Sequence, residues 1–306
     1  MKGCNLLYNF LYMQIQYRNN NLLQHPLIFR LARIMRSSAL YVLMILAVLW
    51  SVFPLFWVLI SSIRPDIETY AFEQTFFPTN PTLDNYVSLF KITPFGLWMK
   101  NSAILSVATT LAVVLLSSMT AYAMSRFRYK SFKIMSQLTL LAYMMPAIIL
   151  VVPIFFLLFS LNLVNSQFGL LLVYIGTRLS VGLWMLRSYF QGIPIELEES
   201  AMVDGATRFQ AFWKIILPQA FPGMISTAIF TFSVTWQEFL FASILIFNSR
   251  SQTISAGVAT FISEDWIYSW GTLMAAGVMI SLPLVLLYAF LQRYLIAGWG
   301  GGAVKG

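Results

Sequence analysis

Six long apolar runs divide this chain, and polar segments rich in charge or proline separate them. A helix that crosses a lipid bilayer needs about 20 consecutive apolar residues, and each of the six runs is of that order. We therefore expect an all-α integral membrane protein with six transmembrane helices. The expected spans are residues 39–63, 97–123, 134–161, 168–190, 224–247 and 270–291.

The polar segment 191–222, QGIPIELEESAMVDGATRFQAFWKIILPQAFP, carries its own helix start and stop signals. Pro194 suits the first turn of a helix, and the three glutamates after it stabilise the positive N-terminal end. Gly205 ends this helix, because glycine reaches the left-handed conformation without a Cβ penalty. Thr207 and the glutamine three residues later have the spacing of a capping box, and an apolar stripe follows at i, i+3, i+4 and i+7. We predict a helix, a glycine turn and an amphipathic helix that Pro218 ends.

Composition supports the membrane class. The chain is 59% hydrophobic and 10% charged, whereas about a quarter of the residues of a soluble domain are charged. The net charge of +8 does not indicate nucleic acid as a partner, because the basic residues cluster at alternate ends of the apolar runs. The single cysteine excludes an internal disulfide and cysteine-based metal clusters, and the single histidine excludes an H-E-x-x-H site. We expect no metal site and no catalytic residues.

The basic residues predict the orientation in the lipid bilayer, because cytoplasmic loops carry an excess of Lys and Arg. One side holds Arg126, Arg128, Lys130, Lys133, Arg187, Arg208, Lys214, Arg293 and Lys305. The other side holds Arg64, Lys91, Lys100 and Arg250. Both termini and segment 191–222 are therefore expected in the cytoplasm. We divide the chain into a cytoplasmic N-terminal extension (1–38) of open role, a permease-like membrane domain (39–292) and a cytoplasmic tail (293–306).

Segment 191–222 resembles the EAA loop of ABC importer permeases, whose pattern is E-A-A, three residues, Gly, nine residues and then I-x-L-P. Here Glu199-Ser200-Ala201 is followed after three residues by Gly205, and after nine more by Ile215-Ile216-Leu217-Pro218. Ser200 for the first alanine is a small-for-small departure. An ordinary polar loop with two short helices would explain the caps and the stripe, but not the full spacing.

Four further segments resemble the carbohydrate-uptake branch of these importers, in particular the smaller maltose-permease subunit (MalG type). They are FPTNPTLDNYVSLF (77–90), TAYAMSRFRYK (120–130), WQEFLFA (236–242) and QRYLIAGWGGGAVKG (292–306). With the EAA-like loop, the resemblance covers the chain from about residue 39 to its C-terminus. It implies a MetI-like type I importer permease fold, as a multi-pass protein of the bacterial inner membrane.

The resemblance also implies partners: a second permease subunit, two ATPase subunits and an extracytoplasmic sugar-binding protein. ATP and Mg²⁺ would bind the ATPase subunits, since this chain has no P-loop motif. We expect no cofactor here and no enzyme activity. In the family the EAA loop docks into an ATPase cleft and carries its motion to the membrane. The coupling residues implied here are Glu196, Glu198, Glu199, Ser200, Ala201, Asp204, Gly205 and Pro218.

The C-terminal tail of the maltose-type subunit reaches into the ATPase dimer. The resemblance implies the same contact for Gly302, Ala303, Val304, Lys305 and Gly306. The residues alone would favour a flexible glycine-rich end.

Two charged residues fall clearly inside the expected spans, away from their ends: Arg178 and Glu238. Charges within a membrane are costly and usually functional. Glu238, with Trp236 and Gln237, falls on the family's fifth-span motif, and two roles stay open for it: lining the translocation pathway or holding a helix contact. Arg178 either pairs with Glu238 or meets an anionic substrate such as a uronate or phosphate-bearing sugar, and ion pairing is the simpler hypothesis. These four residues are our candidates for the translocation pathway.

Two other classes of function fit less well. An ion-coupled secondary transporter places ion ligands at mid-membrane, and two intramembrane charges are few for a proton or ion pathway. It would also leave the EAA-like loop unexplained. A membrane-embedded enzyme has no support, because the chain lacks a histidine pair and a G-x-S-x-G motif. The sequence does not identify the sugar, its charge, or whether this subunit contacts it.

Overall fold

The computed structural model describes residues 26–72, 75–127, 129–264 and 269–300 of the 306-residue chain, and its regular elements are all helical. By its contacts the chain divides after Trp57 into two units, which we describe separately. The first unit holds most of α2 (Pro26–Ser62), whose apolar part, Ser37–Ser62, is long enough to span a membrane. This confirms the first predicted span. Pro54 lies inside α2, as membrane helices tolerate.

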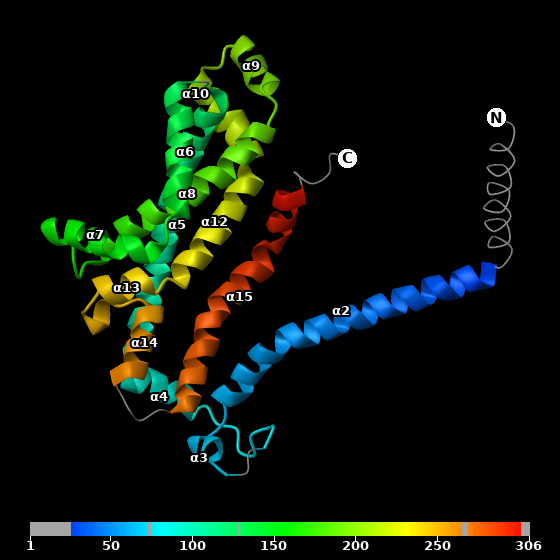
Figure 1. Cartoon of the computed structure of the whole chain (residues 1–306), viewed down its shortest axis with the longest axis vertical. Coiled ribbons are helices and arrows are strands. Elements are labelled where there is room, and N and C mark those ends of the chain that lie inside the picture. Colours follow the sequence, from blue (N-terminus) through cyan, green and yellow to red (C-terminus); the bar gives the residue numbers. More distant parts are fainter. Residues whose placement is uncertain (1–25, 73–74, 128, 265–268, 301–306) are drawn as a thin grey trace, which may run out of the picture. The chain divides into compact units, whose positions relative to one another are not determined.

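The second unit holds the remaining helices, labelled as in Figure 1. They are α3 (Asp66–Thr69), α4 (Asp84–Ile92), α5 (Phe95–Arg126), α6 (Lys130–Met144), α7 (Ala147–Ser160), α8 (Gln167–Gly192), α9 (Glu196–Val203), α10 (Arg208–Ala211), a π-helical turn (Phe212–Ile216), α11 (Leu217–Gln219), α12 (Phe221–Trp236), α13 (Leu240–Leu245), a 3₁₀ turn (Ser249–Ser251), α14 (Ile254–Glu264) and α15 (Trp270–Gly300).

Three spans of this unit match the sequence-based expectation, and two are broken. Helices α5, α8 and α15 are each long and apolar enough to cross a bilayer, which confirms the second, fourth and sixth spans. The third span is two helices, α6 and α7, bent by 103°. Pro146 stands at this break, where its missing N–H interrupts the helical hydrogen bonds. The second broken pair is Arg208–Gln219 with Phe221–Trp236, bent by 70°. Each broken pair can still form one span, so the described residues contain four to six candidate spans.

The prediction of a continuous fifth span over 224–247 is wrong in its second half. Helix α12 ends at Trp236, and residues 240–245 form the separate short helix α13. The physical reason is Glu238, whose carboxylate accepts hydrogen bonds from the backbone N–H groups of Phe241 and Ala242. A side chain that binds the first free N–H groups of a helix starts a new helix at that point.

The long helices of the second unit pack through small residues. Helix α5 contacts α8 and α12, and α12 also contacts α8 and α15 (Figure 1). A Cβ atom on Gly182 would lie 2.7 Å from Cγ1 of Val113, and one on Gly223 would lie 2.4 Å from the ring of Tyr189. Such close approach of helix backbones is typical of packing in membranes.

The EAA-like segment lies at one end of this helical unit, and α4 and α14 lie at the other (Figure 1). The segment 77–90 leads into the short helix α4, which starts at Asp84. The Asp84 N–H donates to Oγ1 of Thr82 at 3.1 Å. Near the same end, Asn101 of α5 donates to the carbonyl oxygens of Arg250 and Gln252, both at 2.9 Å. The loop that holds Arg250 and Gln252 is thus fixed to α5.

Candidate functional site

The EAA-like segment folds as its local signals predict, with two exceptions. The first is Pro194, which lies just before α9 and not in its first turn, because the N-cap residue is Ile195. Helix α9 covers Glu196–Val203, and Gly205 follows with φ 91°. Thr207 and Gln210 form the capping box, with both of its hydrogen bonds present. The prediction that Pro218 ends the second helix is wrong, since helical residues continue to Gln219. A π-helical turn, Phe212–Ile216, precedes Pro218. Its hydrogen bonds join residues five apart instead of four, so the pattern of paired carbonyl groups before the proline differs from that of an α-helix.

The four acidic residues of this segment divide into two groups. Glu196, Glu199 and Asp204 are exposed, whereas Glu198 is buried. We expected all four carboxylates to be presented together to a partner, and Glu198 differs because its helix face turns toward α5. Ala201, three residues later on the same face, is also buried.

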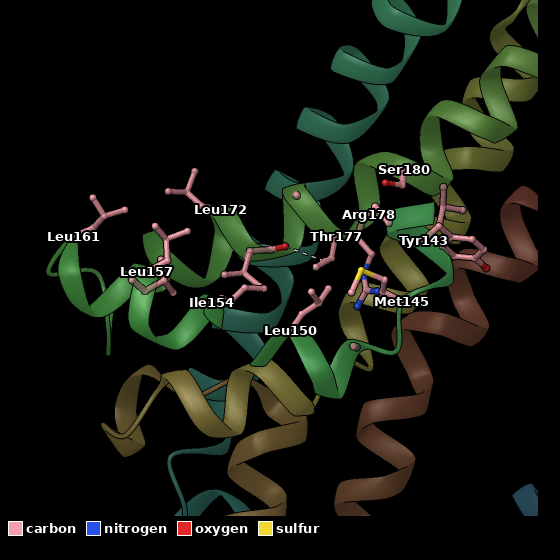
Figure 2. Close-up of a pocket in the computed structure, with 16 residues that line it drawn as sticks. Tyr143, Met145, Leu150, Ile154, Leu157, Leu161, Leu172, Thr177, Arg178 and Ser180 are labelled. Atoms are coloured by element: carbon pink, nitrogen blue, oxygen red, sulfur yellow. Dashed lines mark hydrogen bonds between the residues drawn. The ribbon is translucent and has the colours of Figure 1, made fainter. Parts of the chain in front are cut away.

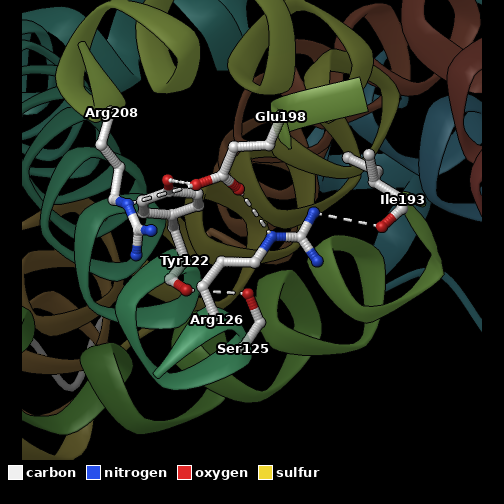
Figure 3. A network of polar contacts seen from close by, with 6 residues as sticks. All are labelled: Tyr122, Ser125, Arg126, Ile193, Glu198 and Arg208. Atoms are coloured by element: carbon white, nitrogen blue, oxygen red, sulfur yellow. Dashed lines mark hydrogen bonds and ion pairs between the residues drawn. The ribbon is translucent and has the colours of Figure 1, made fainter. Parts of the chain in front are cut away.

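Glu198 is the centre of a polar network that joins α9 to the end of α5 (Figure 3). Tyr122 donates its hydroxyl hydrogen to Oε1 of Glu198 at 2.6 Å, and Arg126 donates from Nε to Oε2 at 3.0 Å. Arg126 also donates from Nη2 to the carbonyl oxygen of Ile193 at 3.1 Å. Arg208 lies 3.8 Å from Oε1 through its Nε atom and is half exposed. The Glu198 carboxylate on α9 therefore contacts groups on two other helices, α5 and α10.

The Arg126–Glu198 pair is withdrawn from solvent, with side chains 6% and 3% exposed. A buried pair adds little net stability over a well-packed apolar pair, but removing one partner costs about 3–5 kcal/mol because the other charge is left uncompensated. The aromatic ring of Tyr122 packs on Phe212, with ring centroids 4.6 Å apart. The network thus fixes the position of α9 without adding an exposed charge.

The outer face of α9 carries charge and one prominent apolar side chain. Val203, at the end of α9, is 88% exposed, and Leu197 is 39% exposed. Glu196 and Glu199 flank them on exposed positions. An exposed face that combines apolar and acidic side chains in this way suits contact with another protein.

Of the four translocation-pathway candidates, two hold the fold together. Oε2 of Glu238 accepts from the hydroxyl of Tyr174 of α8 at 2.7 Å, in addition to the two backbone bonds that start α13. Trp236 donates from Nε1 to the carbonyl oxygen of Ile280 at 3.1 Å. Gln237 is exposed. Between the two roles left open for Glu238, the structure shows bonds for the helix contact.

Arg178 and Glu238 do not form the direct ion pair that we predicted, although the charge of Glu238 acts on Arg178 from a longer distance. No described carboxylate oxygen lies within 4.0 Å of the Arg178 guanidinium. The Glu238 carboxylate instead accepts hydrogen bonds from uncharged donors, one hydroxyl and two backbone N–H groups. Arg178 lines a pocket between α6, α7 and α8 (Figure 2).

Sequence reasoning missed three residues of this site: Tyr122, Tyr174 and Val203. The two tyrosines lie in apolar runs, where an aromatic residue indicates packing, and each partner carboxylate is more than 60 residues away. The spacing of Glu198 and Ala201 was an available signal, because residues three apart share a helix face.

Comparison with known proteins decides the family. The sequence profile described as "binding-protein-dependent transport system inner membrane component" matches residues 113–300. The chain belongs to this family. As a permease component it is a transport subunit and not an enzyme. The matched residues include the whole EAA-like segment and the network around Glu198.

Individual relatives cover most of this permease. The inner membrane ABC transporter permease protein YcjP of Escherichia coli is 36% identical over 84% of this chain and 92% of its own length. The trehalose/maltose transport system permease protein MalG of Thermococcus litoralis is 34% identical over 86% of this chain and 94% of its own length. The resemblance to carbohydrate-uptake permeases is thereby confirmed.

The fold matches a solved importer. The crystal structure of a bacterial ABC transporter involved in the import of the acidic polysaccharide alginate matches with a TM-score of 0.75 and 21% identity, over 86% of this permease and 96% of that chain. At this identity the match shows the fold alone, and it confirms the expected MetI-like permease architecture. The tail contact expected of Gly302–Gly306 lies outside the described residues.

Proposed function

We propose that this permease forms one half of the translocation pathway of an ATP-driven, binding-protein-dependent importer of a sugar or oligosaccharide. Two ATPase subunits, which bind ATP and Mg²⁺, dock on α9 from the cytoplasm. A second permease subunit completes the pathway in the bacterial inner membrane, and an extracytoplasmic binding protein delivers the sugar. The names of the relatives support the sugar class.

The observation that carries this proposal is the construction of α9. Its inner face is tied to α5 by the buried Glu198 network, and its outer face exposes Val203 with Glu196 and Glu199. A helix that is free on one side and rigidly joined to a long membrane helix on the other transmits displacement of the docked partner to that membrane helix. Gly205 lets the chain leave α9 in a left-handed turn.

The transport cycle follows from this connection. ATP binding closes the ATPase dimer, α9 moves with it, and α5 moves because Arg126 and Tyr122 hold Glu198. The long helices then rock between inward-facing and outward-facing arrangements around the sugar, as transporters with alternating access do. The C-terminal residues 302–306 add a second contact to the ATPase dimer in this proposal.

The test is co-purification of the tagged, detergent-solubilised chain from its native membrane, with the bound proteins identified by mass spectrometry. The wild-type chain should recover an ATPase, a second permease and a binding protein. Val203→Asp places a charge on the docking face and should lose the ATPase while retaining the second permease. Ile67→Asp is the matched control, because Ile67 is 83% exposed on α3 at the other end of the unit (Figure 1).

Two outcomes would contradict the proposal. Recovery of the wild-type chain alone, able to move solute without ATP, would favour a secondary transporter. Equal ATPase recovery with Val203→Asp and Ile67→Asp would place the docking surface elsewhere.

A further inference from the structure

The pocket between α6, α7 and α8 has a polar end and an apolar end. Its volume is about 590 Å³. Tyr143, Arg178 and Met145 lie toward one end, and Leu157 and Leu161 toward the other (Figure 2). Pockets that hold small molecules have this character, with apolar walls and a few polar groups that fix the orientation.

Arg178 is the charged group of this pocket, and it is unpaired. It forms no hydrogen bond or ion pair with any residue that the structure describes, and its Nε atom is buried without an acceptor. The side chain as a whole is half-buried, and the charge of Glu238 acts on it only from beyond the 4.0 Å of an ion pair. A charge that is partly withdrawn from water without a close partner is costly. The free guanidinium therefore favours an acceptor from outside this chain.

The position of Arg178 along α8 bears on the source of that acceptor. Eleven residues separate it from the start of α8 at Gln167 and fourteen from its end at Gly192. At 1.5 Å per residue these are about 16 Å and about 21 Å. The hydrocarbon core of a bilayer is about 30 Å thick, so Arg178 lies near its middle. Lipid headgroups lie far from this depth, whereas substrate sites of transporters lie at it.

The surroundings of the guanidinium suit a sugar. The break between α6 and α7 brings Met145 and Ala147 to the pocket wall, and irregular backbone at membrane depth occurs where it lines a cavity. Tyr143 and Ser180 line the pocket with hydroxyl groups that form no hydrogen bond with a described residue. Apolar walls strengthen the attraction between opposite charges.

We propose that Arg178 binds an anionic group of the transported sugar, a carboxylate, sulfonate or phosphate, in this pocket. The inference rests on the proposed import function and names the substrate class: a sugar that carries negative charge. Arg178 donates hydrogen bonds to the anionic group, and the hydroxyls of Tyr143 and Ser180 are available to the sugar hydroxyls. No covalent step is involved.

The experiment measures the charge preference of the pocket with two thiol reagents, one bearing a sulfonate and one a trimethylammonium group, both methanethiosulfonates. Cys4 is the only native cysteine, so Cys4→Ser with Ser180→Cys places one thiol beside Arg178. The complete importer is reconstituted in nanodiscs of phosphatidylcholine, with Arg178 intact, Arg178→Gln or Arg178→Lys. The rate at which each reagent modifies the thiol is divided by the rate of the same reagent with free mercaptoethanol, which corrects for the different intrinsic reactivities of the two reagents. Ile92→Cys, exposed on α4, is the matched reporter.

With Arg178 intact, the sulfonate reagent should modify the Ser180→Cys thiol faster than the trimethylammonium reagent, by about tenfold. Arg178→Gln should remove this preference and Arg178→Lys should keep most of it. The Ile92→Cys reporter should not respond to either change. Adding the binding protein with its sugar and ATP should slow the sulfonate reagent when Arg178 is intact, and not with Arg178→Gln.

The opposite results would overturn the proposal. A thiol that does not react shows a pocket closed to water. The absence of any preference with Arg178 intact shows a charge already neutralised, for example by a carboxylate of the second permease, and a preference that Arg178→Gln leaves unchanged comes from another charge. A preference that disappears only in discs with anionic phosphatidylglycerol assigns the site to a lipid headgroup. Equal protection by the sugar with and without Arg178 removes the sugar from this site.

The two proposals fail separately. Absence of the ATPase and the binding protein from the purified complex contradicts the importer function. The charge preference measured on the chain alone still decides whether Arg178 attracts anions.

Discussion

Glu198→Gln tests the connection between α9 and α5 most directly, because the amide keeps the shape of the side chain and removes its charge. In the structure Tyr122 and Arg126 bind the two carboxylate oxygens at 2.6 Å and 3.0 Å, and the Arg126 side chain is 6% exposed. The change leaves the Arg126 guanidinium buried beside a neutral group. The free-energy cost of such an uncompensated charge is about 3–5 kcal/mol.

This cost should appear as local opening of α9, because Glu198 holds that helix in place. Local segments open with their own free energies, which amide hydrogen exchange measures. A loss of about 3 kcal/mol corresponds to roughly 100-fold faster exchange, since 1.4 kcal/mol is a factor of ten. We expect this increase for the amides of α9, measured by mass spectrometry on the solubilised protein.

The matched control is Glu199→Gln, one residue later on the same helix. Glu199 is exposed, and exposed charges contribute about 0–1 kcal/mol, so exchange should change by less than about fivefold. Replacing both buried partners, with Arg126→Met and Glu198→Leu together, removes the unpaired charge and should restore most of the protection. Equal exchange in the two glutamine variants, or a double variant as open as the single one, would refute the reasoning.

Three further changes test other parts of the fold. Gly205→Ala should cost about 1–2 kcal/mol of stability because the φ angle of this residue is 91°. The added Cβ would meet nothing within 4 Å, so the strain is in the backbone alone. Gly205→Asn should cost less, because asparagine adopts the left-handed conformation more readily than alanine. Gly182→Ala should cost about 1–3 kcal/mol of stability through its clash with Val113, seen as a lower thermal unfolding temperature, and Val113→Ala in the same chain should recover part of this loss. Hydrogen bonds from Thr79 lower the pKa of the Glu68 carboxyl from its ordinary 4.5. This contact therefore stabilises the loop between α3 and α4 at pH values above 4.5 and is lost as the pH falls through the lowered pKa. Proteolysis of this loop should become faster at low pH, and Glu68→Gln should abolish that pH dependence.

Each of these has a contrary outcome. Gly205→Asn as damaging as Gly205→Ala would show that the left-handed backbone is not the cause. A Gly182→Ala variant that Val113→Ala further destabilises would place the clash elsewhere. Loop proteolysis that responds to acid equally with Glu68→Gln would assign the response to another group.

The sequence predicts most of the membrane helices because the signal lies within each segment. A run of about 20 apolar residues is sufficient on its own, and α5, α8 and α15 follow it. The turn at Gly205 and the capping box at Thr207 are equally local. The breaks are harder, since proline inside a membrane helix is tolerated. Pro54 stays within α2, whereas Pro146 stands between two helices.

The buried side of α9 depends on residues far away along the chain. Glu198 is one of several glutamates near a helix start, and there a carboxylate is explained by the helix dipole alone. Its partners Tyr122 and Arg126 precede it by 76 and 72 residues. No local pattern joins them, so the sequence predicts a cluster of exposed acids where the structure divides it.

Arg178 and Glu238 show why two opposite charges within the spans need not form an ion pair. Glu238 and Arg178 are the obvious partners by sign, but a carboxylate also accepts hydrogen bonds from uncharged donors. Tyr174 of α8 and two backbone N–H groups are such donors, and the break that ends α12 frees the two N–H groups. An arginine has no such alternative supply here, because helix carbonyls are already used within the helix. Satisfying Glu238 internally therefore leaves Arg178 as the cation that needs an external anion, which is the condition for the binding site proposed above.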